Sequence, residues 1–160
     1  MSDYKQTLKN IKELDSKNTN IVFVTWDFNK NYTDQLEEKN EKYLKKQWFT
    51  NIEKYRVPWV LEIPAMIKRI VNKKDKVDLI IIFWVVIRWE TTHYDIVSEQ
   101  QARAIMNLSI EYSDKVAMIN WILTCENKEQ VKTRVEKSEV YSISWLNLLW
   151  EIKKIYYTKK

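Results

Sequence analysis

Glycine is absent from the 160 residues of this sequence, and cysteine and histidine occur once each. An average usage of about 7% predicts roughly 11 glycines in a chain of this length. A single cysteine excludes a disulfide scaffold and is typical of proteins from a reducing compartment. The longest apolar run, Leu79 to Ile87, is short beside the roughly 20 residues of a membrane-spanning helix. The segment Met1–Asn20 is charged and polar, so we expect no signal peptide and a soluble, cytoplasmic protein.

The chain has the length of one domain, since domains usually contain about 100–200 residues. With 45% apolar residues it can bury a substantial core. We expect an N-terminal extension at residues 1–19, with a weak helical stripe of Tyr4, Leu8 and Ile11, and a single domain at residues 20–160.

The net charge of +5 comes mainly from scattered lysines rather than from an arginine-rich stripe. A nucleic-acid-binding surface is one interpretation, and lysines on solvated helix faces are the other. Because the sequence has no recognisable RNA- or DNA-binding motif, we expect no nucleic-acid partner. The basic balance would still attract a phosphorylated small molecule.

Short β-branched apolar runs alternate with segments of helical periodicity. The runs at 21–25, 79–87 and 116–124 are almost continuously apolar, which is typical of strands covered on both faces. Residues 52–57 alternate more and indicate an edge strand. Helical patterns lie at residues 35–47, 65–72, 95–112, 127–137 and 144–156. This alternation predicts an α/β fold, a three-layer α/β/α sandwich around a four-stranded parallel sheet.

Ligands of such sheets bind outside the carboxyl ends of the strands, where this sequence collects informative residues. Residues 90–92 lie between a strand and a helix, so backbone N–H groups and threonine hydroxyls there can bind a phosphate. His93 follows directly, and a histidine side chain exchanges protons near neutral pH. The alternative for a lone histidine is a surface or packed residue without a chemical role.

Three other residues each allow two interpretations. Phe28 can stack on a flat ring or pack in the core. Glu62 can accept hydrogen bonds from a polyol, or interact with the dipole of the helix that follows it. Arg134 can act on a ligand or be a solvated helix charge. Cys125 and His93 have no second cysteine or histidine, so we expect no metal site and no thiol catalyst.

Several segments resemble the lumazine synthase family. Residues 57–64 (VPWVLEIP) resemble its Val-Pro-Gly-x-x-Glu-Ile-Pro motif. Residues 84–95 (WVVIRWETTHYD) resemble its Gly-x-Val-Ile-Arg-Gly-Glu-Thr-x-His-Phe-Asp segment, the most specific of the matches. Residues 120–127 (NWILTCEN) resemble its Gly-Val-Leu-Thr stretch, and Phe28-Asn29 resembles the end of its first strand. The resemblance spans about residues 20–156.

The resemblance implies a flavodoxin-like lumazine synthase fold and a cofactor-free enzyme of riboflavin biosynthesis. The family condenses 5-amino-6-ribitylaminouracil with 3,4-dihydroxy-2-butanone 4-phosphate to 6,7-dimethyl-8-ribityllumazine, releasing phosphate and water. By resemblance, His93 is the proton shuttle, and Arg134 reaches the phosphate from a neighbouring subunit. The substrate-binding positions that the family implies are Phe28, Trp59, Val60, Leu61, Glu62, Val86, Ile87, Glu90, Thr91 and Asn120.

The family also implies an assembly, because its active sites lie between the subunits of a homopentamer. Pentamers can pair into decamers or close into a cage of sixty subunits. Two alternatives therefore stay open, a non-catalytic shell protein and an archaeal-type riboflavin synthase. The retained Phe28, Glu62, His93 and Arg134 favour an enzyme over a shell, and the loop at 90–93 favours lumazine synthase over riboflavin synthase.

Two departures from the family pattern are visible. Thr92 stands where the family usually has proline, and the family's lysine before the last helix has no clear counterpart near Ser144. We expect the threonine to loosen the phosphate loop while leaving the neighbouring donors available.

Tryptophan occurs eight times. Five of these residues stand where the family has glycine: Trp59, Trp84, Trp89, Trp121 and Trp145. Random mutation would not turn several glycines always into tryptophan, so we hypothesise that the codon UGA, read here as tryptophan, means glycine in the source organism. Tryptophan cannot imitate glycine at positive φ or at a close backbone approach. We therefore expect the chain as written to be impaired, and glycine at positions 59, 84, 89 and 121 to restore activity.

Overall fold

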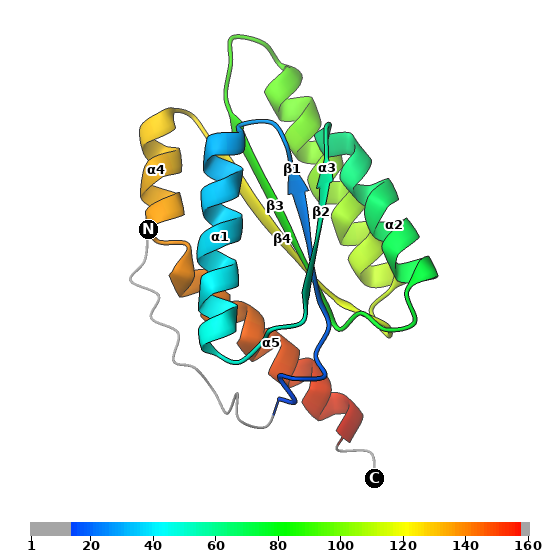
Figure 1. Cartoon of the computed structure of the whole chain (residues 1–160). Coiled ribbons are helices and arrows are strands. Elements are labelled where there is room, and N and C mark those ends of the chain that lie inside the picture. The colour runs from blue at the N-terminus through cyan, green and yellow to red at the C-terminus, as the bar shows by residue number, and fades with distance from the viewer. Residues whose placement is uncertain (1–13, 158–160) are drawn as a thin grey trace.

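The computed structural model describes residues 14–157, which form an α/β fold (Figure 1). Four strands build one parallel sheet in the order β2-β1-β3-β4. The strands are β1 (Ile21–Trp26), β2 (Ile52–Val57), β3 (Leu79–Ile87) and β4 (Ala117–Cys125). The helices are α1 (Lys30–Lys46), the short 3-10 helix η2 (Val60–Glu62), α2 (Ile63–Lys73), α3 (His93–Glu111), α4 (Lys128–Glu136) and α5 (Glu139–Tyr157).

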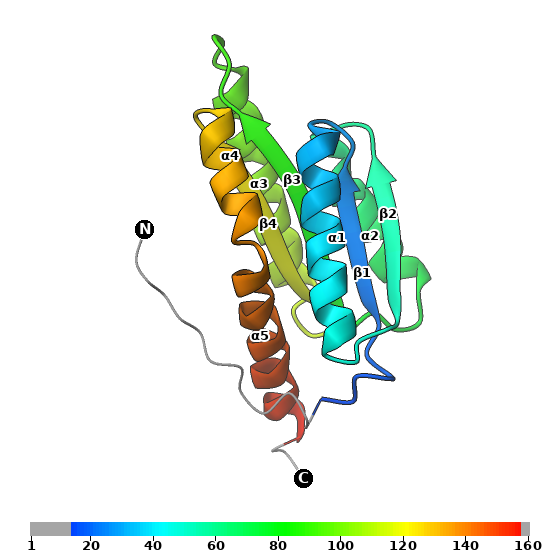
Figure 2. The same cartoon turned by 60° about the vertical axis from the view of Figure 1, so that its left-hand side comes forward.

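The sheet separates two layers of helices. Helices α2 and α3 cover one face, and α1, α4 and α5 cover the other (Figure 2). This confirms the predicted three-layer sandwich, and the strand order is that of flavodoxin-like folds. None of the helices in the described part of the chain is long and apolar enough to cross a membrane.

The continuous apolar run of β3 is explained by its central position, because its side chains alternate between two cores. Ile81 and Phe83 belong to the core that also contains buried side chains of α1, α4 and α5. Ile82 and Trp84 belong to the core under α2 and α3. Fully burying one such side chain contributes about 1.5–3 kcal/mol, so β3 is the main anchor of the fold.

Helix α1 begins at Lys30, five residues before the predicted start at residue 35. Asn29 makes the difference, since it adopts a left-handed conformation with φ 51° and turns the chain sharply after β1. Its carbonyl oxygen accepts hydrogen bonds from the backbone N–H groups of Tyr32 and Thr33. Thr33 is therefore the fourth residue of the helix, and it is buried.

The start of α5 differs from the prediction by as much as that of α1, and other boundaries agree better. Strands β2 and β3 have the predicted limits, whereas α5 begins at Glu139 instead of residue 144. Helix α3 begins at His93 rather than at residue 95, because Asp95 and Ile96 both donate backbone hydrogen bonds to the carbonyl oxygen of Thr92. His93 is thus the first residue of this helix.

Helix α1 ends in a motif that usually requires glycine. The backbone N–H of Phe49 donates to the carbonyl oxygen of Leu44, and the backbone N–H of Trp48 donates to that of Lys45. This is the hydrogen-bond pattern of a Schellman motif. Trp48 occupies the left-handed position with φ 68° and is 77% exposed. Within residues 14–157 only Asn29 and Trp48 have positive φ, so the five tryptophans matched to family glycines do not.

The segment before β1 is attached to the domain. Leu14 is buried in the core beneath α1 and α5, and Lys153 of α5 donates to the hydroxyl of Thr19 at 3.1 Å. The predicted helical stripe at Tyr4, Leu8 and Ile11 lies outside the described residues.

Candidate functional site

The carboxyl ends of the parallel strands meet at one edge of the sheet, and the loop after β1 carries Phe28. This ring is 45% exposed, as a stacking platform requires. It stacks on Trp26 with centroids 5.0 Å apart, and Trp89 lies edge-on to it at 6.4 Å. Phe28 is therefore presented at the surface, but two tryptophans already contact it.

The loop of Phe28 is tied to the middle of the sheet. The side-chain amide of Asn29 donates to the carbonyl oxygen of Val85 at 2.8 Å. That oxygen is accessible because β1 pairs with β3 only as far as Phe83, whereas β4 follows β3 to Ile87. The end of β3 is thus open on the side of Phe28.

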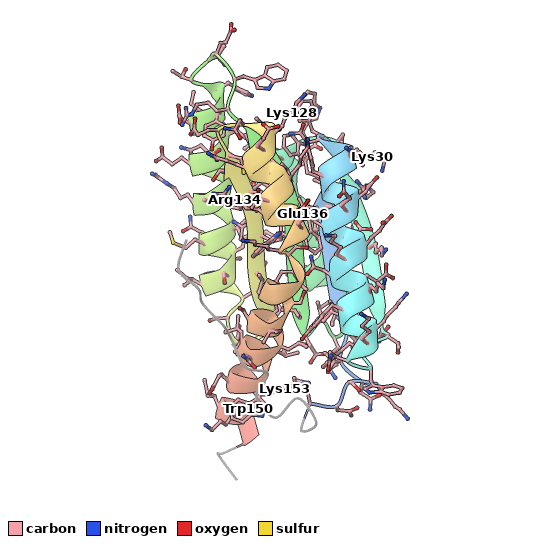
Figure 3. The ribbon with its side chains drawn as sticks, turned by 90° about the vertical axis from the view of Figure 1, so that its left-hand side faces the viewer. Lys30, Lys128, Arg134, Glu136, Trp150 and Lys153 are labelled. Carbon is pink, nitrogen blue, oxygen red and sulfur yellow. The ribbon has the colours of Figure 1, made fainter. Side chains whose placement is uncertain are left out.

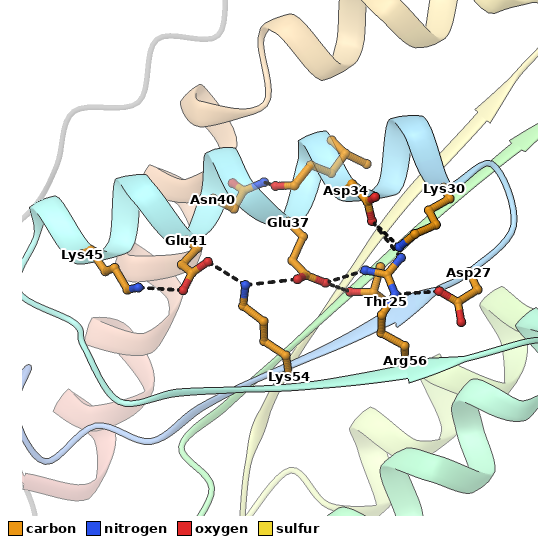
Figure 4. Close-up of polar contacts among 11 residues, drawn as sticks. Thr25, Asp27, Lys30, Asp34, Glu37, Asn40, Glu41, Lys45, Lys54 and Arg56 are labelled. Carbon is orange, nitrogen blue, oxygen red and sulfur yellow. Dashed lines mark hydrogen bonds and ion pairs between the residues drawn. The ribbon is translucent and has the colours of Figure 1, made fainter.

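Arg56 of the edge strand β2 fixes the same loop from the other side. Figure 4 shows its guanidinium between three carboxylates, those of Asp27, Asp34 and Glu37, at distances of 2.6, 2.9 and 3.3 Å. Desolvation by burial lowers the pKa of Arg56, but the hydrogen bond that it donates to Asp27 and the nearby negative charges outweigh it and raise the pKa overall. The group remains a cation.

The loop after β2 forms the predicted ribityl-binding segment. Val60 is buried and anchors η2, while Leu61 and Trp59 are exposed, the latter at 65%. Glu62 is also exposed, and its carboxylate accepts a hydrogen bond from the backbone N–H of Trp59 at 3.3 Å. Helix η2 contacts α3, so this segment lies against the helix that begins at His93.

The loop between β3 and α3 presents hydrogen-bond donors without acceptors. Among the described residues, none accepts a hydrogen bond from the backbone N–H of Trp89, Glu90 or Thr91. Thr91 and His93 are exposed, and the Thr91 hydroxyl oxygen accepts from the backbone N–H of His93 at 3.4 Å. These donors precede the positive end of the α3 dipole, an arrangement that attracts anions. Trp89 is 72% exposed and lies in the same loop.

Arg88 joins the two ends of this loop. Its guanidinium forms a two-point contact with Asp95 at 3.0 and 2.9 Å and also pairs with Glu126 at 2.9 Å. Hydrogen bonds to Asp95 and Glu126 raise the pKa of Arg88, and the hydrogen bond from Arg88 lowers the pKa of the Asp95 carboxyl. Arg88 also lies over the ring of Tyr94, 4.2 Å from its centroid.

Three predicted positions lie on the strands themselves. Val86 and Ile87 are the last residues of β3, and Val86 is buried. Asn120 lies in β4, half-buried, and its side-chain oxygen accepts a hydrogen bond from the ring N–H of Trp84 at 3.1 Å. Trp84 itself is fully buried, so the core accommodates this tryptophan.

Arg134 lies on the opposite face of the sheet from the helix that begins at His93. Figure 3 shows it on α4, and its guanidinium donates to the carbonyl oxygen of Gln130 at 3.1 Å. Helix α4 packs on one face of the sheet through Val131 and Val135, whereas α3 packs on the other face. Within one chain the sheet therefore stands between Arg134 and His93.

The structure thus collects at one edge the loops of Phe28, of Glu62 and of His93, and places Arg134 on the face of the sheet opposite to α3. The sequence alone indicated no role for Arg88, Asp95 or Arg56. Arg88 and Asp95 lie in the family motif at 84–95, which was the available signal. No local sequence pattern predicts the contact between Arg56 and Asp27, because this contact depends on the pairing of β1 with β2.

Comparison with known proteins identifies the family. A family model described as 6,7-dimethyl-8-ribityllumazine synthase matches residues 18–152. The protein of that name from Limosilactobacillus reuteri is 36% identical over 114 residues, which cover 71% of this chain and 73% of the relative. The chain belongs to the 6,7-dimethyl-8-ribityllumazine synthase family. The family member from Polaromonas sp. is 31% identical over 146 residues, or 88% of this chain and 93% of the relative. The 6,7-dimethyl-8-ribityllumazine synthase 1 of Rhizobium meliloti is 41% identical over 87 residues, which cover 52% of this chain and 56% of the relative.

Membership of the lumazine synthase family confirms the resemblance seen in the sequence. It also confirms the predicted class of activity, a transferase of riboflavin biosynthesis. Enzymes of this family act on small molecules and assemble as oligomers.

Proposed function

We propose that the chain condenses 5-amino-6-ribitylaminouracil with 3,4-dihydroxy-2-butanone 4-phosphate at the carboxyl edge of its sheet, forming 6,7-dimethyl-8-ribityllumazine, phosphate and water. The observation that carries this assignment is the loop at 89–93 in a member of the lumazine synthase family. It combines unpaired backbone N–H groups, a threonine hydroxyl and a histidine in one turn of chain. The reaction needs orientation of two substrates and a proton relay, which these groups can provide without a cofactor.

The butanone phosphate binds, in this proposal, at the start of α3. The backbone N–H groups of Glu90 and Thr91 and the Thr91 hydroxyl donate to the phosphate oxygens. The positive end of the helix adds an attraction of about 0.3–1 kcal/mol for a negative charge at an exposed position. The basic net charge of +5 favours the approach of this anion from solution.

His93 moves the protons. Imine formation needs a proton for the departing water, and loss of the phosphate needs a proton to be taken from carbon. His93 is exposed, lies two residues after Thr91 and donates its backbone N–H to the Thr91 hydroxyl oxygen. Its imidazole is therefore available to the substrate rather than engaged in the core. A positioned general acid–base contributes about 10²–10⁴-fold to rate.

The pyrimidine binds next to Phe28 and the open end of β3. Because β1 stops short of the end of β3 and the backbone N–H of Arg88 faces β4, the backbone groups of Ile87 face the open side and can bind the ring. The ribityl chain extends along the segment from Trp59 to Glu62, whose carboxylate accepts from a hydroxyl group. Val60 holds that segment in place by its burial.

A neighbouring subunit completes the site. Since the sheet separates Arg134 from His93 within one chain, we assign Arg134 to the phosphate bound by an adjacent subunit, with Asn120 facing that neighbour. The assembly that fits this arrangement is a homopentamer, alone or as part of a decamer or a sixty-subunit cage. We place the enzyme in the cytoplasm.

An assay with both substrates tests the proposal. The absorbance of 6,7-dimethyl-8-ribityllumazine should rise with the release of one phosphate per product, and omission of either substrate should abolish both signals. Assembly without any product, both by the chain as written and by a form with glycine at positions 59, 84, 89 and 121, would support the shell protein. Conversion of added lumazine into riboflavin would support riboflavin synthase. Either result would overturn the proposal.

A further inference from the structure

We propose that Arg88 is the positioning residue of the phosphate loop, acting through a clamp that it forms with Asp95 and Glu126. This inference rests on the proposed function, since it concerns the loop assigned to the butanone phosphate. Arg88 does not touch the phosphate in this account. It fixes the distance between the end of β3 and the start of α3, and thereby the direction of the backbone N–H groups between them.

The clamp connects three segments of the chain. The Arg88 backbone N–H donates to the carbonyl oxygen of Cys125 at 2.8 Å, which continues the pairing of β3 with β4. The two terminal nitrogens of its guanidinium bind the two oxygens of Asp95 in the first turn of α3. The remaining nitrogen, Nε, pairs with Glu126 at the start of the connection to α4. All three guanidinium nitrogens are therefore used.

The loop has little else to hold it. The backbone N–H groups of residues 89–91 make no hydrogen bond within the described chain, and the side chains of Trp89, Glu90 and Thr91 are exposed. Thr92 replaces the family's usual proline, so the backbone is not restricted there by a ring. A two-point Arg–carboxylate contact specifies geometry as well as energy, and here it closes the loop at both ends.

The charges of the clamp distinguish positioning from direct binding. One guanidinium faces two carboxylates, so the group carries a net negative charge and would repel a phosphate by charge alone. If Arg88 attracted the phosphate directly, removal of the Asp95 charge would strengthen phosphate binding. If Arg88 positions the loop, the same change weakens binding.

Inorganic phosphate provides a probe that does not depend on turnover. A ligand that binds the folded state raises the melting temperature, so the rise produced by phosphate over chloride at equal ionic strength reports binding. We expect Arg88→Met and Asp95→Asn each to weaken phosphate binding about tenfold, the effect of losing roughly one hydrogen bond to a charged group. Arg88→Lys should fail to restore it, because a lysine cannot form the two-point contact.

A matched control lies on the same helix. Arg103 and Glu99 form an exposed ion pair at 2.8 Å, and Arg103→Met and Glu99→Gln should leave the phosphate effect unchanged. In the assay, Arg88→Met should raise KM for the butanone phosphate about tenfold and change KM for the ribitylaminouracil little.

The possible outcomes separate the clamp from the proposed function. If the parent protein forms product and Asp95→Asn binds phosphate as well as or better than the parent, the clamp is refuted while the function stands. If neither the parent nor its Trp89→Gly form shows a phosphate effect, the clamp is also refuted. The remaining outcome is that phosphate binding weakens in the variants as expected while neither the parent nor its Trp89→Gly form makes product. In that case the assignment of the phosphate loop holds and the proposed reaction fails.

Discussion

The ring of Trp89 lies edge-on to the ring of Phe28, with centroids 6.4 Å apart and an interplanar angle of 61°. Trp89 belongs to the phosphate loop and thus lies against the proposed stacking platform, where the two substrates have to meet. We predict that Trp89→Gly raises kcat/KM at least tenfold, about the effect of relieving a misplacement of the reacting groups. The assay is the initial rate of product formation with each substrate varied in turn.

Trp48→Gly is the matched control for this substitution. Trp48 is also exposed, but it follows α1 at the opposite, amino end of the sheet. Its replacement should leave kcat/KM unchanged. Equal rates for the parent and Trp89→Gly would contradict the proposal that residue 89 obstructs the site.

Trp48→Gly should instead change stability. A side chain with a Cβ pays about 1–2 kcal/mol in the left-handed conformation that glycine adopts freely. We predict that Trp48→Gly is about 1 kcal/mol more stable to urea than Trp48→Ala, since both lose the exposed indole and only alanine keeps the Cβ. If the alanine variant is equally stable, the end of α1 does not require glycine.

The hypothesis of UGA read as glycine has a direct chemical test. Trp48 was not among the five tryptophans matched to family glycines, yet the Schellman motif around it favours glycine. In protein isolated from the source organism, we predict that the peptides covering residues 48 and 89 have the mass of glycine at these positions. A peptide with tryptophan at position 89 would end the hypothesis.

The network around Arg56 should matter for stability. Glu37 is buried and is shared by Arg56, Lys54 and the hydroxyl of Thr25 (Figure 4). Removing the arginine leaves this carboxylate and Asp27 with fewer partners. We predict that Arg56→Met lowers the free energy of unfolding by about 2 kcal/mol, as measured by urea denaturation.

The control for Arg56 is again Arg103→Met, which removes an exposed pair on α3. Such pairs contribute about 0–1 kcal/mol, so the free energy of unfolding should change little. Similar values for the two variants would show that burial of Glu37 adds nothing to the network.

The sequence predicts most closely those parts of the fold that depend on local burial. The limits of β3 follow from an uninterrupted apolar run that only a central strand of a parallel sheet can bury. The start of α1 was missed because it depends on Asn29, whose side chain is held by Val85, 56 residues away along the chain. No local pattern contains that contact.

In the candidate site, too, features set by a local motif are predictable, whereas contacts set by strand pairing are not. The motif at 84–95 predicts the phosphate loop, but the partner of Arg88 in the connection to α4 is set by the register that places Ile87 beside Cys125. Likewise, the hydrogen bond between Trp84 and Asn120 depends on the pairing of β3 with β4. The register of strand pairing, not the composition, determines these contacts.

The most direct test of the shared active site is subunit mixing. His93→Ala and Arg134→Ala should each lose most of the activity, about 10²-fold or more for His93→Ala. When the two variants are co-expressed and assembled together, about a quarter of the sites should combine an intact His93 with an intact Arg134 of the neighbour in a ring of identical contacts. We predict that activity returns to about a quarter of that of the parent. If the mixed assembly is no more active than the better of the two variants alone, the two residues do not act together across a subunit boundary.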